Sequence, residues 1–321
     1  MALRGVILDC DSLGPDDLDL TPLLGTLPSW QRYPVTAAAQ VAGRISDADV
    51  VVTNKVVLDA ALLVQAPRLK LVCVAATGTN NIDVAAAHRQ GICVTNVAGY
   101  GVGSVAQHTL TLMLSLATQL PRYAAAVERG DWCRSPFFCL LDYPIVELAD
   151  KALGIVGYGA IGQAVAKLAR ALGMRVLVSA RPGAEVPVPG RLPFAQVLAD
   201  ADVVSLHCPL TETTAQLINA ETLAQMRPGA FLINTARGGL IDESALAAAL
   251  KRRALAGAAL DSISVEPPPA DHPMLAGDIP NLLLTPHCAW GSQPARQRLV
   301  GELANNIEAF KQGTPRNLVL P

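Results

Sequence analysis

Short apolar runs along this chain alternate with stretches in which apolar residues return at helical spacing. In the first third, apolar runs occur at 5–9, 69–75 and 92–96. The stretch 47–53 is a β-branched run with an acidic lead-in, and a further strand is predicted at 35–40. Helical spacing occurs at 58–64 and 83–89. Runs that are apolar throughout are typical of parallel strands covered on both faces. The pattern therefore predicts alternating strands and helices in a flavodoxin-like α/β arrangement.

The same alternation returns in the second half of the chain. Strands are predicted at 152–156, 175–179, 202–207, 230–234, 257–261 and 281–285, and helices at 161–172 and 243–252. The sequence Asp-Ala-Asp-Val-Val occurs at both 47–51 and 200–204, as two similarly wound domains would show. The chain has 321 residues, and single cores stop growing at roughly 250–300. We therefore expect an α/β fold of two doubly wound parallel-sheet domains, one Rossmann-type and one flavodoxin-like, with a cleft between them.

A glycine-rich turn lies between the strand at 152–156 and the helix after it. Gly157, Gly159 and Gly162 have the spacing G-x-G-x-x-G. In such a turn the first glycine makes the tight bend, the second lets the backbone approach a pyrophosphate, and the third packs the helix against the strand. The N–H groups at the helix start would hold the phosphates. With its strand before it and its helix after it, the motif predicts dinucleotide binding.

Two segments outside these units bear on the domain organisation. The longest helical pattern, 102–120, has few charges on any face, so it is expected to be buried between domains or subunits. The aromatic stretch 130–143 is interpreted as a linker or a subunit-contact arm, with a loop folded over its own core as the alternative.

The last helical pattern, 293–312, follows the end of the nucleotide-binding series and is predicted to return to the first domain. The predicted substrate domain is therefore discontinuous, comprising 1–98 and 290–321. The dinucleotide-binding domain comprises 99–289, including the long helix and the arm.

Composition and charge narrow the class of protein. Hydrophobic residues make up 51% of the chain and charged residues 16%, and the formal net charge is −2. Without a long basic run, neither nucleic acid nor an anionic membrane surface is an expected partner, and no apolar run reaches the roughly 18 residues of a membrane span. The seven cysteines lack C-x-x-C pairs, which predicts reduced thiols in a cytoplasmic protein and no metal site.

Polar side chains with chemical potential follow several predicted strands. Arg237 comes directly after the strand at 230–234 in a glycine-flanked loop, and a guanidinium can hold a carboxylate through two parallel hydrogen bonds. Glu266 leads into three prolines, and His287 ends another strand. A carboxylate partner favours the protonated form of an imidazole. At the strand ends of a dinucleotide domain, these residues predict proton transfer beside a hydride site.

Four motifs in this order carry a family resemblance: GYGAIG at 157–162, NTARGGLID at 234–242, DSISVEPPP at 261–269 and TPHCAWGS at 285–292. The chain resembles the D-isomer-specific 2-hydroxyacid dehydrogenase family, and is most similar to its glycerate dehydrogenase (hydroxypyruvate reductase) branch. The resemblance extends over nearly the whole sequence. It implies an NAD(P)-dependent oxidoreductase that transfers a hydride between the nicotinamide and a small D-2-hydroxyacid or 2-oxoacid.

The resemblance also implies residue roles. Arg237 would bind the substrate, Glu266 would orient and charge the histidine, and His287 would be the general acid and base. The backbone N–H groups of Thr77 and Gly78 would receive the substrate carboxylate.

Further implied contacts concern the cofactor, the pocket wall and the assembly. The implied dinucleotide contacts are Gly157, Gly159, Ala160, Ile161, Gly162, Pro209, Thr235, Ala236 and Asp261. Trp290 would line the substrate pocket, and the helix at 102–120 would build a homodimer.

The strand after the glycine turn departs from the common pattern. It usually ends in an acid that binds the adenosine ribose, whereas here Ala180 stands in that place, between Ser179 and Arg181. A carboxylate would repel a 2′-phosphate, while Ser179 and Arg181 could bind one. The sequence therefore favours NADP(H) over NAD(H); a solvent-exposed arginine in an enzyme that accepts both is the alternative.

Other functions fit less well. Formate dehydrogenase, in the same family, does not require the proton-transfer partner that Glu266 supplies. The long type of phosphoglycerate dehydrogenase is disfavoured because nothing follows Pro321 to form a regulatory domain. 2-Ketogluconate reduction is the alternative within the branch. A nucleotide-sensing binding protein of the corepressor type is the alternative from another class; the low charge and the lack of disordered tails argue against it.

Overall fold

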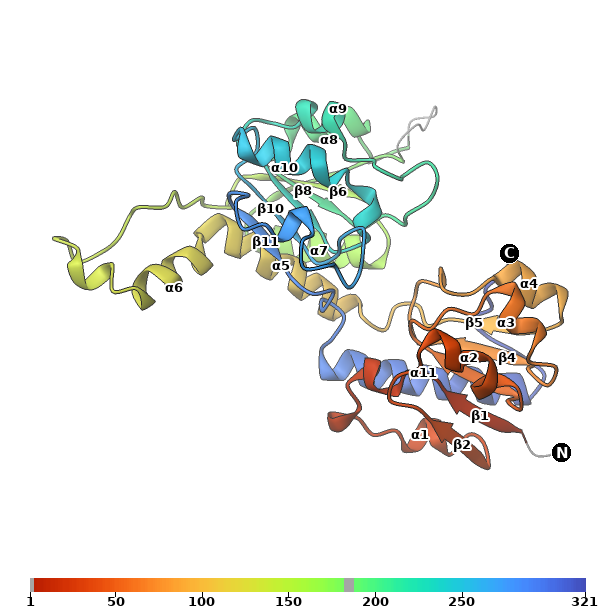
Figure 1. The fold of residues 1–321 in the computed structure, drawn as a ribbon. Helices are drawn as coiled ribbons and strands as arrows, with labels where there is room; N and C mark the ends of the chain where they lie inside the picture. Colours follow the sequence, from red (N-terminus) through yellow and green to blue (C-terminus); the bar gives the residue numbers. More distant parts are fainter. Residues whose placement is uncertain (1–2, 182–187) are drawn as a thin grey trace. The chain divides into compact units, whose positions relative to one another are not determined.

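The computed structural model describes residues 3–181 and 188–321. The chain forms two compact units, Met1–Gly101 with Gly291–Pro321, and Val102–Trp290, so it passes from one unit to the other at 101/102 and again at 290/291. Figure 1 shows the elements of each unit. The assignment of the two units as substrate and dinucleotide domains stays a prediction at this point.

The first unit contains a five-stranded parallel sheet in the order β2-β1-β3-β4-β5. Its strands are β1 (Arg4–Ile7), β2 (Ser29–Arg32), β3 (Val50–Thr53), β4 (Leu71–Val74) and β5 (Cys93–Thr95). Its helices are α1 (Thr21–Leu24), α2 (Ala38–Ile45), α3 (Ala60–Val64), α4 (Val84–Arg89) and α11 (Gln293–Lys311). This strand order is that of flavodoxin-like folds, and α11 packs on α1 and β4 of this unit.

The strand predicted at 35–40 is wrong, because the structure has helix α2 at Ala38–Ile45 instead. Alanine and glutamine favour the helix, and the side chain of Gln40 accepts a hydrogen bond from the backbone N–H of Ala37 at 3.1 Å. Val41 and Ile45, four residues apart, are both buried. The second strand of the sheet is β2, whose sequence SWQR contains no apolar run and is mostly exposed.

The second unit contains a six-stranded parallel sheet in the order β11-β10-β9-β8-β6-β7. Its strands are β6 (Ala152–Val156), β7 (Arg175–Val178), β8 (Val203–Leu206), β9 (Phe231–Asn234), β10 (Gly257–Leu260) and β11 (Leu282–Leu284). Its helices are α5 (Val102–Thr118), α6 (Leu120–Glu128), α7 (Ala160–Ala171), α8 (Phe194–Asp200), α9 (Ala220–Gln225) and α10 (Glu243–Lys251). Both sheets are parallel throughout, which confirms the predicted fold class.

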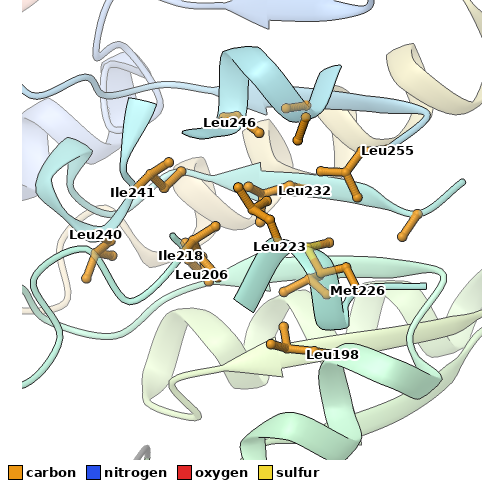
Figure 2. Packing of buried hydrophobic residues seen from close by; sticks show 14 of the residues in the cluster. Leu198, Leu206, Ile218, Leu223, Met226, Leu232, Leu240, Ile241, Leu246 and Leu255 are labelled. Carbon is orange, nitrogen blue, oxygen red and sulfur yellow. The ribbon is translucent and has the colours of Figure 1, made fainter. Parts of the chain in front are cut away.

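Helices cover both faces of this sheet because successive strand residues point to opposite sides. Leu232 of β9 packs in the cluster with residues of α8, α9 and α10, as Figure 2 shows. Its neighbours Phe231 and Ile233 pack in the other cluster, with α5 and α7. Each fully buried side chain of this kind stabilises the fold by about 1.5–3 kcal/mol. The result is a fixed sheet whose carboxyl ends hold the loops described below.

Helix α5 ends earlier than the pattern 102–120 predicts. It stops at Thr118, and Gln119 takes a left-handed conformation with φ of 56° before α6 begins. Pro121 then stands in the first turn of α6, where its missing N–H costs nothing. α5 packs against α7, β9 and β10, inside the second unit. Among the described residues, no helix combines the length and the apolar character that a membrane span needs.

Candidate active site

The glycine turn between β6 and α7 has two glycines fixed by packing and one that faces open space. A Cβ on Gly157 would stand 2.4 Å from the backbone N of Cys208, and one on Gly162 would stand 2.2 Å from the carbonyl oxygen of Gly157. For a Cβ on Gly159, no atom of the described residues beyond the glycine and its two chain neighbours would lie within 4 Å. Gly159 is also the N-cap of α7, so the open space lies at a helix N-terminus. These residues fit a dinucleotide pyrophosphate.

The end of β7 shows how Ser179 and Arg181 are placed. Ser179 is 1% exposed, and its hydroxyl donates to the carbonyl oxygen of Ala180 at 2.7 Å. Arg181 is exposed. The side chain of Arg181 could therefore contact a 2′-phosphate without rearrangement. Ser179 would first have to break its hydrogen bond to the carbonyl oxygen of Ala180. The predicted roles of both residues stay predictions.

The loop after β9 is braced by the buried side chain of Asn234. Its Oδ1 accepts from the backbone N–H of Ala236 at 3.0 Å, and its Nδ2 donates to the carbonyl oxygen of Arg237 at 2.8 Å. Thr235 Oγ1 lies 2.9 Å from Thr109 Oγ1 of α5. The guanidinium of Arg237 is half-buried and donates to the carbonyl oxygen of Ala236 at 2.7 Å. The backbone from which Arg237 projects is thus fixed on both sides.

The loop after β10 lies directly against this arginine loop. A Cβ on Gly238 would stand 2.0 Å from the carbonyl carbon of Ile263, so glycine is required there. Glu243, at the start of α10, accepts from the backbone N–H of Ser264 at 2.6 Å and from its hydroxyl at 2.9 Å. Glu266 folds back, and its Oε1 accepts from the N–H of Ile263 at 3.0 Å. These contacts set the direction of the Glu266 side chain.

Glu266 and His287 meet at the carboxyl edge of the sheet. Glu266 Oε2 lies 2.7 Å from His287 Nδ1, and the two side chains are 35% and 29% exposed. This distance is typical of a charge-assisted hydrogen bond. His287 has a φ of 51°, a left-handed conformation that costs a non-glycine residue about 1–2 kcal/mol. Trp290 donates from its indole nitrogen to the carbonyl oxygen of His287 at 2.9 Å, which helps to hold the turn.

Asp261 organises the turn that carries His287. Its Oδ1 accepts from Thr285 Oγ1 at 2.6 Å and from the N–H of Cys288 at 3.0 Å, and its Oδ2 accepts from the N–H of Ala289 at 2.9 Å. Burial alone would raise the pKa of Asp261, but the hydrogen bonds from His108, Thr285 and the two amides lower it below its usual range. The carboxylate is therefore ionised and already bonded within the protein. Its predicted contact to the cofactor stays a prediction.

His108, Asp261 and Cys288 place their potential metal-ligand atoms within 4.8 Å of one another. Thr285 and the amide of Cys288 already donate to Asp261 Oδ1, and His108 Nε2 contacts Thr285 at 3.0 Å. Burial raises the pKa of the Cys288 thiol, and the Asp261 charge raises it further, so the thiolate that a metal needs is disfavoured. The arrangement is that of a hydrogen-bonded cluster.

A second histidine lies at the end of β8. His207 Nε2 is 2.9 Å from the hydroxyl of Ser205, and desolvation lowers the pKa of His207 to about 4. This ring is uncharged at neutral pH. Pro209, two residues further on, is exposed, and its carbonyl oxygen accepts from Thr214 Oγ1 at 2.7 Å.

The predicted site residues divide between the two units. Arg237, Glu266, His287 and Trp290 lie in the second unit, whereas Thr77 and Gly78 follow β4 in the first. Thr77 Oγ1 donates to the carbonyl oxygen of Val97 at 2.9 Å, and Asn96 Nδ2 donates to the carbonyl oxygen of Thr77 at 2.7 Å. The loop of Thr77 is thus fixed from the β5 side.

The polar residues of α5 that reach these loops were not predicted from the sequence. Ser104 Oγ donates to the carbonyl oxygen of Ala289 at 2.6 Å, and His108 and Thr109 reach the loops after β11 and β9. A signal was present: three polar residues at positions i, i+4 and i+5 share one side of a helix that is otherwise largely apolar.

Comparison with known proteins gives a consistent result. The family model described as "D-isomer specific 2-hydroxyacid dehydrogenase, NAD binding domain" matches residues 110–289. The chain is 45% identical to a glycerate dehydrogenase of Methylorubrum extorquens, over 99% of each chain. It is 39% identical to a hydroxypyruvate reductase of Blautia hydrogenotrophica, again over 99% of each.

Among solved structures, the fold is similar to that of an NADPH-dependent glyoxylate/hydroxypyruvate reductase from Sinorhizobium meliloti in complex with NADP and malonate. The TM-score is 0.83 at 27% identity, covering 99% of this chain and 97% of the other.

Proposed function

This chain belongs to the D-isomer-specific 2-hydroxyacid dehydrogenase family, and from that premise we propose that it reduces hydroxypyruvate and glyoxylate to the corresponding D-2-hydroxyacids, and catalyses the reverse oxidations. It is an oxidoreductase with a dinucleotide-binding domain, and relatives bear the names glycerate dehydrogenase, hydroxypyruvate reductase and glyoxylate reductase. The single observation that carries the proposed chemistry is the 2.7 Å contact between Glu266 Oε2 and His287 Nδ1.

That contact assigns the two ring nitrogens of His287 different tasks. Nδ1–H is held by the carboxylate of Glu266, so Nε2–H is the group that can donate a proton to substrate. In reduction, the bound nicotinamide cofactor supplies a hydride to the keto carbon of the oxoacid. His287 transfers its Nε2 proton to the alkoxide oxygen, and the neutral ring keeps its Nδ1–H on Glu266. In oxidation, Nε2 accepts the hydroxyl proton.

Substrate binding is assigned to Arg237 and to the backbone N–H groups of Thr77 and Gly78. Two-point binding by Arg237 fits the carboxylate that all 2-oxoacids share, and the bracing by Asn234 keeps the arginine loop in place. Thr77 and Gly78 follow β4 in the first unit, and their assignment rests on the family resemblance. Trp290 is assigned to the pocket wall beside His287.

For the cofactor we propose a preference for NADPH over NADH. Support comes from the residues at the end of β7, where Ala180 replaces a ribose-binding acid and Arg181 is exposed. The matched family domain is named for NAD, while the similar reductase from Sinorhizobium meliloti binds NADP. The glycine turn and the start of α7 (Gly157, Gly159, Ala160, Ile161 and Gly162), with Pro209, Thr235 and Ala236, would hold the rest of the dinucleotide.

We also propose that the enzyme is a cytoplasmic homodimer. The arm after α6 exposes Phe137, Phe138 and Leu141 to 73%, 91% and 77%, and apolar side chains this exposed are typical of an interface. All seven cysteines are free thiols, as in reducing compartments. Light scattering should give twice the 33.6 kDa chain mass.

A substrate screen tests the proposed function directly. Purified enzyme is mixed with NADPH or NADH and with glyoxylate, hydroxypyruvate, pyruvate or 2-ketogluconate, and the absorbance of the reduced nicotinamide is followed. We expect the highest kcat/KM with hydroxypyruvate or glyoxylate. Turnover confined to 2-ketogluconate would replace the proposed substrate, and no turnover with any 2-oxoacid would overturn the proposal.

The cofactor preference is tested in the same assay. Wild-type enzyme should have the higher kcat/KM with NADPH, and Ala180→Asp should reverse the ratio because a carboxylate repels the 2′-phosphate. A wild-type preference for NADH would show that Arg181 does not select the cofactor.

A further inference from the structure

Helix α5 contacts both ends of the turn that carries His287. Ser104 and His108 are four residues apart, so they lie on the same face of the helix. Ser104 Oγ donates to the carbonyl oxygen of Ala289 at 2.6 Å, and His108 Nε2 lies 3.0 Å from Thr285 Oγ1. The turn from Thr285 to Ala289 is thus attached to α5 by its first and its last residue.

The hydrogens in this cluster can be assigned from the distances. Thr285 Oγ1 carries one hydrogen and lies 2.6 Å from Asp261 Oδ1, a short distance typical of donation to a carboxylate. The threonine hydroxyl therefore accepts from His108, whose Nε2 must carry a hydrogen. The same nitrogen is 3.4 Å from Asp261 Oδ1. His108 is thus the terminal donor of a chain that runs through Thr285 to the buried carboxylate.

The turn needs such support because His287 is held in a left-handed conformation with φ of 51°. Strained residues persist only where their surroundings over-determine them. The backbone N–H groups of Cys288 and Ala289 are bound by Asp261, and that carboxylate is in turn bound by Thr285. The crossing to the other unit at 290/291 lies only three residues after His287.

From these contacts we propose that His108 is a positioning residue: by donating from Nε2 to Thr285, which in turn donates to Asp261, it holds the His287 turn in the orientation from which His287 transfers its proton. The inference rests on the proposed function, and deepens it by adding α5 to the proton-transfer apparatus. His108 itself contacts neither Glu266 nor the reacting atoms in this arrangement. Its effect is exerted through Thr285 and Asp261.

The kinetic test compares His108→Leu, which removes the donor, with His108→Gln, whose Nε2–H can take its place. We expect His108→Leu to lower kcat with the oxoacid by about tenfold, the effect of losing one hydrogen bond to a charged network. The KM should change far less, and His108→Gln should recover most of the rate. Gln107→Leu, at the neighbouring exposed position of α5, serves as the matched control and should behave as the wild type.

A wild-type kcat in His108→Leu would overturn the proposal, as would an effect confined to KM. Equal losses in the leucine and glutamine variants would also overturn it, since they would reflect the size of the ring and not its hydrogen bond.

A measurement without substrate separates this inference from the proposed function. NMR spectra are recorded above pH 8 on enzyme whose histidines are labelled with ¹⁵N. The signals of His108 are those that disappear in His108→Gln, and they should show that Nε2 carries the hydrogen. The downfield Nδ1–H resonance of His287 should persist in His108→Gln and broaden or vanish in His108→Leu. Hydrogen on His108 Nδ1, or an unchanged His287 resonance in the leucine variant, would overturn the inference even if the enzyme reduces oxoacids. If the enzyme reduced no oxoacid, the proposed function would be overturned. The NMR signals of His108 and His287 would still test whether His108 holds the His287 turn.

Discussion

Two histidines at the carboxyl edge of the six-stranded sheet have opposite surroundings. His207, after β8, contacts the neutral hydroxyl of Ser205 at 2.9 Å, and desolvation lowers its pKa to about 4. His287, after β11, contacts the carboxylate of Glu266 at 2.7 Å and is 29% exposed. The partner of each ring decides what it can do: a neutral, desolvated imidazole is a structural group, whereas one that faces a carboxylate can carry a proton.

A similar contrast separates the two carboxylates of the loop after β10. The side chain of Asp261 is 3% exposed and accepts hydrogen bonds at both oxygens from the His287 turn. Glu266 is 35% exposed and uses one oxygen for the backbone of Ile263 and the other for the imidazole. We interpret the first as the group that fixes geometry and the second as the group that takes part in chemistry. The variants below test both contrasts.

The largest effect is expected from His287→Gln, which removes the proton donor while keeping a polar side chain. General acid catalysis contributes about 10²–10⁴-fold, so kcat for oxoacid reduction should fall by about 10³-fold. His207→Gln should keep most of its activity. Steady-state kinetics of both variants at pH 7 provide the measurement. Comparable losses in the two would erase the distinction between the histidines.

Asp261→Asn should give the next effect, this time on stability. The amide cannot accept all the hydrogen bonds that the carboxylate accepts, and one NH₂ group would face the donors of the turn. We expect the free energy of unfolding in urea at pH 7 to fall by about 2–4 kcal/mol.

The direction in which pH changes the stability of Asp261→Asn relative to the wild type can be predicted. The pKa of Asp261 is lower in the folded protein than in the unfolded chain. The stabilisation by ionised Asp261 is therefore complete at a pH above the unfolded-state pKa, and it is lost as the pH falls through the folded-state pKa. The variant should therefore lose less stability in acid than the wild type. Asp278→Asn, which breaks an exposed ion pair with Lys251, is the control and should change stability very little. An Asp261→Asn protein as stable as the wild type would refute the structural role.

His207→Gln should change the pH dependence of stability. With a folded pKa of about 4, His207 stays neutral while the unfolded chain takes up a proton near the usual pH of about 6.5. The wild type should therefore lose about 1–2 kcal/mol from this group as the pH falls from 7 to 5. Urea unfolding at both pH values should show a smaller loss for the variant. Parallel curves would mean that His207 titrates normally.

Glu266→Gln should have the smallest effect, confined to catalysis. The amide keeps the shape of the side chain but removes the negative charge that lies 2.7 Å from His287 Nδ1. The kcat for oxoacid reduction at pH 7 should drop by about tenfold, while the free energy of unfolding stays nearly unchanged because the side chain is partly exposed. An unchanged kcat would remove Glu266 from the mechanism.

The sequence predicts best where a feature depends on neighbouring residues. The strand Ala152–Val156, the glycine turn and α7 follow from one continuous stretch, and the structure agrees to within a residue. The edge strand β2 was missed because SWQR has no apolar run. The last three residues of the strand expected at 35–40 belong to α2, since helix formers there outnumber the β-branched pair at its start.

Prediction of the site is limited even more strongly to features that depend on neighbouring residues. Arg237, Glu266 and His287 could be singled out because each follows a predicted strand. The network around Asp261 could not, since Thr285 lies 24 residues away from it and His108 lies 177 residues from Thr285. Such pairings depend on how α5 packs on the sheet, which a local pattern does not contain.

The most direct test is a crystal structure of the enzyme with reduced cofactor and oxamate, an unreactive analogue of a 2-oxoacid. We predict that His287 Nε2 lies within hydrogen-bond distance of the oxamate carbonyl oxygen, with Nδ1 still on Glu266 and Arg237 on the carboxylate. Oxamate bound with its carbonyl oxygen away from His287, or held without Arg237, would contradict the account.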